Sequence, residues 1–237
     1  MAVIFGSARI DENGKASGGK AGDQKQTAST DWKGEVSLEN GYIHKLGWVV
    51  LRTKNPEIAH KIAFAMLQAC NNKNIGYDQN QRLGIITNGT ASQIATECDC
   101  SSLVRQCVKE ATGVDAGNFT TANEKSKLLA TGLLDEVKFT SLKALKEGDI
   151  LVTKTKGHTV IVVESSNTAT QPSNTYPKYT GTSVSLVVAL KEVVEKDTSY
   201  SHRRKIAVAN GIANYAGTAS QNTSLLKMLK NGTLKKA

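Results

Sequence analysis

The chain has 237 residues, of which 39% are hydrophobic and 5% aromatic, and its formal net charge at pH 7 is +9. This length predicts one sizeable domain and a smaller one. No stretch approaches the roughly 20 apolar residues that a membrane-spanning helix needs, and the first residues lack the basic segment and apolar core of a secretory signal. We therefore expect the protein to remain in the cytoplasm of the cell that makes it until another route releases it.

The first part of the chain predicts turns, a strand and a helix. Residues 6–30 are rich in Gly, Lys, Asp, Ser and Thr, which favours loops around short strands. Residues 48–51 are predicted to form a strand. Pro56 suits the first turn of a helix over 56–71, because apolar residues recur on one face of that segment. Cys70 lies at the end of this helix, where we expect it to be core or partly buried.

Cys100 opens an amphipathic helix that we expect to run to about Ala111. Gly113 closes the helix, because glycine readily takes the left-handed conformation of a helix end. Asp99 precedes the helix and is expected to cap its first turn rather than to transfer a proton. Cys107 falls on the buried stripe of the helix, so it is predicted to be a packed thiol.

The middle of the chain predicts a helix followed by a strand pair. Residues 123–130 carry the helix signals. Residues 149–152 and 158–163 are apolar runs joined by a lysine-rich turn, which predicts two adjacent strands. His158 is the first residue of the second strand.

The last part of the chain predicts a linker and a small helical unit. Residues 165–183 consist almost wholly of Ser, Thr, Asn, Gln, Pro, Tyr and Gly, a composition typical of linkers. Three helices are then expected, over 184–194, 202–210 and 218–231. A unit as small as 184–237 is marginally stable alone. We therefore expect it to self-associate or to dock on the larger domain.

The positive charge is concentrated in this last part. Residues 166–237 hold ten Lys or Arg against three Asp or Glu, a net charge of +7, whereas residues 1–165 hold twenty against eighteen. A basic tail predicts contact with a polyanion, such as nucleic acid or an anionic cell wall. A solvated lysine face is the plainer interpretation. Nucleic acid ranks last, because the tail has no groove-reading helix and no pattern of stacking aromatic residues.

The cysteines do not predict a disulfide framework, because three of the four lie within ten residues and the chain is long enough to build its own core. They are Cys70, Cys98, Cys100 and Cys107. A zinc site is the rival interpretation. The spacing Cys-x-Cys-x6-Cys lacks the paired Cys-x2-Cys of zinc knuckles, and His44 and His60 offer no matching second half. We therefore expect neither a metal nor a cofactor.

Cys100 and His158 together point to nucleophilic catalysis. A thiol becomes a good nucleophile as thiolate, and a helix N-terminus with a nearby imidazole lowers the thiol pKa. The imidazole can then carry the proton to a leaving amine. A lone cysteine or histidine in such a place is usually structural. The pair, in the order Cys then His and on a helix then a strand, favours a cysteine hydrolase of the papain-like kind.

Three short motifs resemble those of NlpC-type cysteine peptidases and phage cell-wall amidases. Residues 99–104, Asp-Cys-Ser-Ser-Leu-Val, resemble the nucleophile motif of that family. Residues 148–152, Gly-Asp-Ile-Leu-Val, followed after a turn by Gly-His-Thr at 157–159, resemble its strand pair. Residues 75–79, Ile-Gly-Tyr-Asp-Gln, resemble its tyrosine segment.

Longer stretches are similar to phage and prophage endolysins of Gram-positive hosts. These stretches are residues 6–12 and 18–24, and the likeness extends over roughly residues 3–164. Segments between Arg203 and Asn222 resemble those that follow the catalytic domains of such lysins.

The resemblance implies an α+β fold and an active site. Residues 1–164 would form a papain-like NlpC-type catalytic domain, with a central antiparallel sheet and a nucleophile helix, and 184–237 a small all-α wall-binding module. Cys100 would attack an amide carbonyl of peptidoglycan while His158 activates the thiol and protonates the departing amine. The backbone N–H of Cys100 and the hydroxyl of Tyr77 would hold the oxyanion. A half-buried loop tyrosine is the alternative interpretation of Tyr77.

The chain departs from the family pattern at the third catalytic member. The family usually places His, Asn or Gln on the strand after the histidine, where it fixes the tautomer of the imidazole. The available candidates here are Glu164, about 20 Å along the strand from His158, and Asn167. A dyad with a backbone or water partner is the alternative.

The resemblance also implies a biological role. An endolysin would cleave the stem peptide or cross-bridge of Gram-positive walls for host lysis, as an endopeptidase rather than an N-acetylmuramoyl-L-alanine amidase, after leaving the cytoplasm through a holin-made hole. Anionic wall polymers would be further partners. The candidate wall contacts are Arg203, Arg204, Lys205, Tyr215 and Lys227. The alternative function is a non-catalytic wall-binding or tail-associated protein with a degenerate hydrolase fold.

Overall fold

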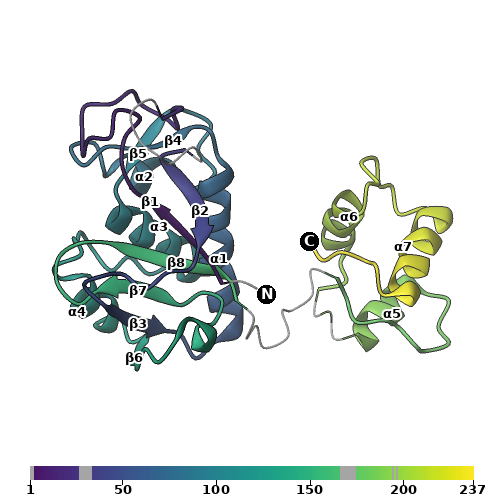
Figure 1. Ribbon diagram of the computed structural model, residues 1–237. Helices are drawn as coiled ribbons and strands as arrows, with labels where there is room; N and C mark the ends of the chain where they lie inside the picture. The colour runs from purple at the N-terminus through teal and green to yellow at the C-terminus, as the bar shows by residue number, and fades with distance from the viewer. Residues whose placement is uncertain (1–2, 27–33, 166–174, 194, 196) are drawn as a thin grey trace. The chain divides into compact units, whose positions relative to one another are not determined.

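A computed structural model describes residues 3–26, 34–165, 175–193, 195 and 197–237. The chain divides into two compact units, Met1–Ala169 and Thr170–Ala237 (Figure 1). Within the described ranges no helix combines the length and the apolar character needed to cross a membrane.

A six-stranded sheet organises the first unit. Its strand order is β2-β1-β8-β7-β3-β6, and every neighbouring pair is antiparallel. The strands are β1 (Ile4–Ala8), β2 (Val36–Asn40), β3 (Trp48–Arg52), β6 (Asp135–Val137), β7 (Ile150–Thr153) and β8 (Thr159–Glu164). Together with the helices of this unit, the sheet makes the fold the α+β class that the sequence predicts.

The central strands are buried on both faces. Along β8, Ile161 and Val163 belong to one apolar cluster, whereas Val160 and Val162 belong to the other. Because successive side chains of a strand point to opposite faces, this alternation places a core on each side of the sheet. The continuous apolar runs that the sequence shows in β7 and β8 follow from this burial.

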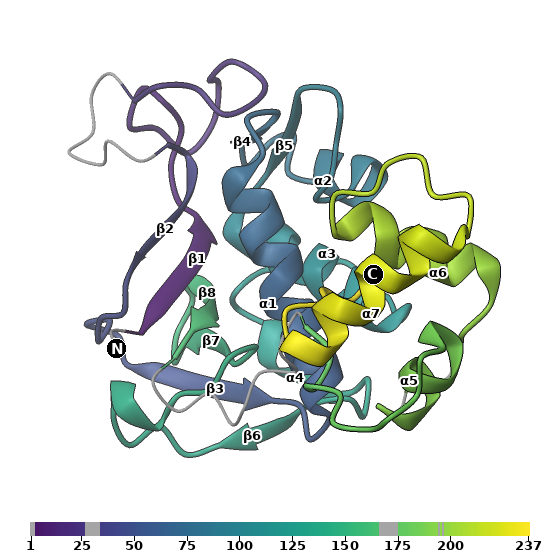
Figure 2. The same cartoon turned by 90° about the vertical axis from the view of Figure 1, so that its right-hand side faces the viewer.

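Two helices cover one face of the sheet, α1 (Pro56–Asn71) and α3 (Cys100–Thr112) (Figure 2). The bounds of α1 are those predicted from the sequence. Asn55 caps α1 by accepting hydrogen bonds from two backbone N–H groups of its first turn. Ile62 and Met66 of α1 are fully buried in the same cluster as residues of α3.

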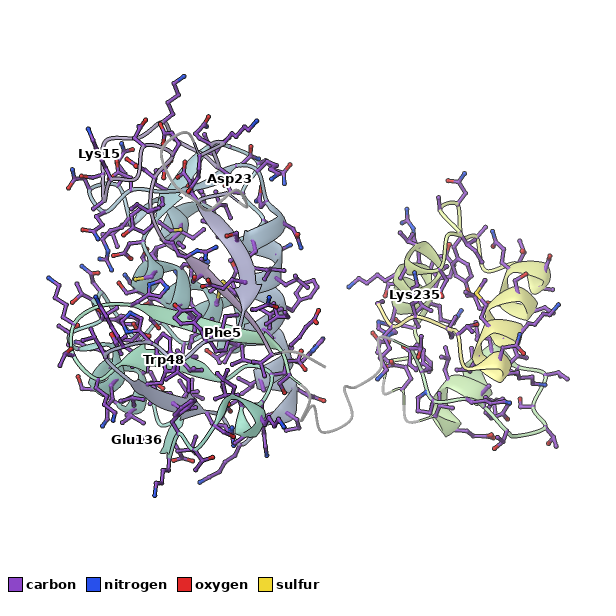
Figure 3. The ribbon with its side chains drawn as sticks, viewed as in Figure 1. Phe5, Lys15, Asp23, Trp48, Glu136 and Lys235 are labelled. Atoms are coloured by element: carbon purple, nitrogen blue, oxygen red, sulfur yellow. The ribbon has the colours of Figure 1, made fainter. Side chains whose placement is uncertain are left out.

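Aromatic side chains fill the opposite face. Phe5 of β1 and Trp48 of β3 lie edge to face, with ring centroids 6.3 Å apart (Figure 3). Tyr42, in the loop after β2, packs against both rings at 5.7 Å. This packing ties the loop that follows β2 to the middle of the sheet.

Shorter elements lead into α3. β4 (Ile75–Tyr77) and β5 (Thr96–Cys98) form a separate parallel pair, and α2 (Gly84–Asn88) lies between them in sequence. β5 ends at Cys98, directly before the cap residue Asp99, so the strand fixes where α3 and its first residue, Cys100, begin. A helix α4 (Glu124–Leu129) and a short 3-10 helix η1 (Leu142–Ala144) complete the described elements of this unit.

The second unit is helical in its described part, with α5 (Leu186–Glu192), α6 (Tyr200–Ala209) and α7 (Ala219–Asn231) (Figure 1). α6 begins two residues before the predicted start, because the Ser199 hydroxyl accepts a hydrogen bond from His202 N–H and caps the helix there. The buried core consists of Tyr176, Tyr179, Leu186, Ala189, Leu190, Ile206, Ala207, Tyr215, Leu225, Leu226, Leu229 and Leu234.

The linker predicted over 165–183 is too long. Residues 166–174 lie outside the described residues, but Tyr176 and Tyr179 are buried in the core of the second unit. Their backbone N–H groups donate to the carbonyls of Leu234 and Leu229, at 2.7 and 3.0 Å. The polar composition of this segment predicts a linker. Two buried tyrosines and two backbone hydrogen bonds are nevertheless enough to fix its end to the second unit.

This corrected boundary predicts which fragment folds. We expect residues 175–237 to unfold in a cooperative thermal transition, whereas 184–237 should show none, because it lacks the two buried tyrosines. Circular dichroism of the two purified fragments measures the difference. Equal stability of both fragments would show that the segment before residue 184 adds nothing to the unit.

Candidate active site

The start of α3 is fixed by a reciprocal cap. Asp99 Oδ1 accepts a hydrogen bond from Ser102 N–H at 2.6 Å, and Asp99 N–H donates to Ser102 Oγ at 2.9 Å. The expectation that Asp99 caps the helix is confirmed. The cap holds the first turn, and with it Cys100, in a single orientation.

Arg82 supports this cap and was missed by the sequence analysis. Its Nε donates to Asp99 Oδ2 at 2.6 Å, and its Nη2 donates to Ser101 Oγ at 3.0 Å and to the Phe119 carbonyl at 2.5 Å. The arginine joins the loop before α2, the helix start and the segment before α4. No local pattern could reveal Arg82, because its partners lie 17 to 37 residues away.

Burial keeps the Cys100 thiol protonated. Only 9% of the residue is exposed, and this burial raises the pKa of the Cys100 thiol, as do the negative charge of Asp99 and any negative charge on Glu124. Hydrogen bonds from the backbone N–H groups of Thr159 and Ser101 act in the opposite direction. The predicted lowering of the thiol pKa is therefore wrong for this state of the protein, because desolvation outweighs the helix N-terminus.

His158 is held through its backbone, and its imidazole is neutral. The N–H of His158 donates to Thr153 Oγ1 at 3.0 Å, and its carbonyl accepts from Thr153 N–H at 3.0 Å. Burial lowers the pKa of His158 to about 4, and the charges of Arg9 and His44 add to this. The imidazole Nε2 is enclosed and has no hydrogen-bond partner among the described residues. Such a nitrogen can accept a proton.

The start of β8 lies against the start of α3. Thr159 follows His158 directly, and its backbone N–H lies close enough to the sulfur of Cys100 to lower the pKa of the thiol. The two residues that the motifs single out thus come from adjacent chain segments in space, although they are far apart in sequence.

The neighbour of β8 on its outer side is β1, rather than a strand that follows β8 in sequence. Gly6 pairs with Ile161, so the end of β1 runs toward His158. Arg9 comes directly after β1 and donates to Glu39 Oε2 at 2.7 Å and to Ser37 of β2. The sequence alone does not predict that Arg9 lies near the imidazole, because the pairing of β1 with β8 brings together the two ends of the unit.

Of the two candidates for a third catalytic member, the structure describes only Glu164, and it does not bring this residue to the imidazole. Glu164 lies at the opposite end of β8 from His158, where it pairs with Ile4 and is exposed. Asn167 lies outside the described residues.

Negative charge at Cys100 would raise the pKa of two tyrosines, Tyr77 and Tyr42. Burial raises the pKa of Tyr77 to about 12, and negative charge at Cys100 adds to this rise. The Tyr77 hydroxyl accepts a hydrogen bond from Gln79 Nε2 at 3.0 Å. Burial likewise raises the pKa of Tyr42 to about 12, with smaller contributions that include Cys100. Both phenols stay protonated at neutral pH, so both can donate hydrogen bonds; Tyr42 was missed in the sequence.

The other cysteines do not share this position. Cys107 is fully buried, as predicted for a packed thiol; Cys98 is also fully buried, and Cys70 is partly buried. All four cysteines are free. In the described part of the chain no three His, Cys, Asp or Glu side chains are grouped so that they could hold a metal ion.

The predicted wall contacts fall into two groups. Arg203 donates from Nε to the Tyr215 hydroxyl at 3.2 Å, and Tyr215 is buried, so this pair holds the second unit together. Arg204, Lys205 and Lys227 are exposed.

An open hollow of about 900 Å³ lies along α6. Arg204 and Lys205 line it beside Tyr200, which is 50% exposed, and Val208, which is 55% exposed. The hollow thus offers two cations, an aromatic ring and an apolar side chain on one face of the helix.

Comparison with known proteins points to one family. A family model described as an endolysin-like domain matches residues 5–169. Over 69 residues the chain is 45% identical to the endolysin of Listeria phage A511, an alignment that covers 27% of this chain and 20% of the phage protein. Over 36 residues it is 56% identical to the L-alanyl-D-glutamate peptidase of Listeria phage A118, covering 15% of this chain and 13% of that protein. The matches therefore span a fifth or less of these relatives. No solved structure matches the chain significantly.

Proposed function

Because the chain belongs to the endolysin-like domain family, we propose that it is a phage endolysin, a peptidase that cleaves Gram-positive peptidoglycan during host lysis. The names of the two Listeria phage relatives support this proposal. One of them is a peptidase of the stem peptide, which favours an endopeptidase over an N-acetylmuramoyl-L-alanine amidase. Such an enzyme would act after leaving the host cytoplasm through a holin-made hole.

The proposed nucleophile is Cys100 and the proposed base is His158, on a papain-like NlpC-type domain. The observation that carries this proposal is the closeness of the Thr159 backbone N–H to the Cys100 sulfur, whose thiol pKa it lowers. Thr159 is one residue from an imidazole whose buried Nε2 has no hydrogen-bond partner among the described residues. Since thiol and imidazole are both neutral at rest, the thiol proton passes to His158 as sulfur attacks the amide carbon. His158 then gives this proton to the departing amine, which leaves a thioester that water hydrolyses.

Hydrogen-bond donors around the sulfur would stabilise the oxyanion. The backbone N–H of Cys100 points from the helix N-terminus, and the protonated Tyr77 hydroxyl supplies a second donor. One such donor contributes about 2.7–4 kcal/mol in other hydrolases. In this scheme Cys100 and His158 act as a dyad, and Thr153 fixes the backbone of His158 on both sides.

The second unit is proposed to bind the wall through the hollow along α6. Residues 166–237 carry a net charge of +7, and the exposed side chains of Arg204 and Lys205 form no hydrogen bond or ion pair with other residues that the structure describes. Anionic wall polymers complement this charge, and Tyr200 offers a face on which a sugar can stack.

A non-catalytic wall-binding protein is the second candidate function. The raised pKa of the Cys100 thiol favours it, because a neutral thiol is a poor nucleophile until a base removes its proton. Measuring lysis by the variants below separates the two functions.

Replacement of the nucleophile should stop lysis. Cys100→Ala should lower the rate of wall lysis at least about a thousandfold, because no other group supplies the attacking sulfur. Cys107→Ala removes a thiol buried in the same helix and should keep activity with some loss of stability. Turbidity of Gram-positive wall suspensions measures the rate, and mass spectrometry of the products identifies the bond. Full activity of Cys100→Ala would refute the assignment.

Activity should require neutral His158. Because burial lowers the pKa of His158 to about 4, kcat/KM should stay constant as the pH falls to about 5 and should drop below about 4. His158→Ala should lose at least about a hundredfold at every pH. His60→Ala is the matched control, because the ring of His60 pairs with Glu147 away from Cys100. An acid limb centred near pH 6.5 would contradict a desolvated imidazole.

Wall binding should depend on the α6 cations more than on total charge. A fusion of residues 175–237 to a fluorescent protein should decorate Gram-positive cells, and the double change Arg204→Ala with Lys205→Ala should remove most of this binding. Lys191→Ala with Lys230→Ala removes the same charge outside the hollow and should bind nearly as well as the parent. Equal losses of cell binding in both double variants would show that the unit binds only through nonspecific electrostatic attraction.

A further inference from the structure

Glu124 is a buried acid beside the active site that the proposed mechanism does not use. It is the first residue of α4, its side chain is fully buried, and its Oε1 lies 2.6 Å from Thr159 Oγ1. Its Oε2 is buried with no hydrogen-bond partner among the described residues. The adjacent Lys125 pairs with Glu136 at 2.7 Å instead. A carboxylate without a counter-ion is costly in such a place, so the neutral acid is favoured.

The hydrogen bonds of Thr159 also favour a protonated Glu124. Thr159 Oγ1 lies 2.6 Å from Glu124 Oε1 and 2.9 Å from the Leu151 carbonyl oxygen. A hydroxyl carries one hydrogen, and a carbonyl oxygen can only accept. If the hydroxyl donates to Leu151, the contact with Glu124 must be donated by a protonated carboxyl. Burial raises the pKa of Glu124 to about 8, against the lowering effect of the Thr159 hydroxyl and with a further rise from the charge of Asp99, so the acid is protonated at neutral pH.

Thr159 links Glu124 to the nucleophile. Its hydroxyl contacts Glu124, and its backbone N–H lies close enough to the Cys100 sulfur to lower the pKa of the thiol. Negative charge on Glu124 would also raise the pKa of the Cys100 thiol. The protonation state of Glu124 therefore affects both the place of the Thr159 amide and the ease of forming the thiolate.

We infer that Glu124 is a positioning residue that acts as a neutral acid: its carboxyl proton is donated to Thr159 Oγ1, which holds the start of β8 against Cys100 and keeps negative charge away from the sulfur. The inference rests on the proposed function for its effect on lysis, but not for its effect on the thiol. The charged and titratable groups that face Glu124 are Asp99, from the β5–α3 junction, and Cys100 of α3. Its hydrogen-bond partner on β8, Thr159, does not titrate, nor does Leu151 of β7, which contacts the Thr159 hydroxyl.

The inference predicts an alkaline loss of activity that depends on Glu124. Loss of the Glu124 proton above about pH 8 removes the donor to Thr159 and places a negative charge near the sulfur. Glu124→Gln keeps a donor in the form of its amide N–H but cannot ionise. Glu124→Ala removes the donor and should lose lysis, Glu124→Gln should restore most of it, and the alkaline limb of the parent should be absent from the glutamine variant. Glu136→Gln removes an exposed carboxylate near α4 and should keep the alkaline limb of the parent.

Two measurements on the full chain do not need lysis. Infrared difference spectra between the parent and Glu124→Gln should show a protonated carboxyl at pH 7 that disappears above pH 8. Alkylation of Cys100 by iodoacetamide, followed by mass spectrometry, should be several-fold faster in Glu124→Gln than in the parent above pH 8, and equal below pH 7. If lysis fails in every protein, including the parent, the proposed function falls while these two results still decide the role of Glu124. A carboxylate band at pH 7, or equal alkylation rates above pH 8, would overturn the inference.

Discussion

The candidate active site depends on one contact, where the start of β8 meets the start of α3 and the Thr159 backbone N–H lies close to the Cys100 sulfur. Separate interactions fix the two partners of this contact. The Asp99 cap sets the position of the helix start, and Arg82 binds Asp99 from another loop. Thr153 of β7 holds the backbone of His158 on the other side. Because the central strands are buried on both faces, neither partner can shift without disturbing a core.

Burial governs the protonation states at this contact. Desolvation raises the pKa of Cys100, Tyr77 and Glu124 and lowers that of His158, so every one of these groups is uncharged at neutral pH. In such a site the Cys100 thiol stays protonated until substrate binds. In the proposed mechanism the proton moves from sulfur to imidazole during attack, and backbone N–H groups stabilise the charge that then forms in a low-dielectric environment.

Local signals in the sequence predicted the elements that carry the site, but not their supports. The Pro56 start of α1 and the Asp99 cap and Gly113 end of α3 follow from side chains within a few residues of one another. Arg82 and the Arg9–Glu39 pair escaped notice, because their roles come from partners brought near by the fold. The thiol pKa was predicted in the wrong direction because burial cannot be read from a motif. The burial of Tyr176 and Tyr179 was not predicted, because they lie in a segment of polar composition. The NlpC-type fold stays a prediction.

The central claim is that the Cys100 sulfur forms a covalent bond to the peptidoglycan stem peptide with His158 as its base. Acid quenching of the full-length protein during digestion of purified Gram-positive walls, followed by mass spectrometry of the peptide that contains Cys100, measures this bond directly. The account predicts a stem-peptide fragment in thioester linkage on Cys100, and no adduct in Cys100→Ala. Release of soluble wall peptides at the full rate from Cys100→Ala would contradict the account.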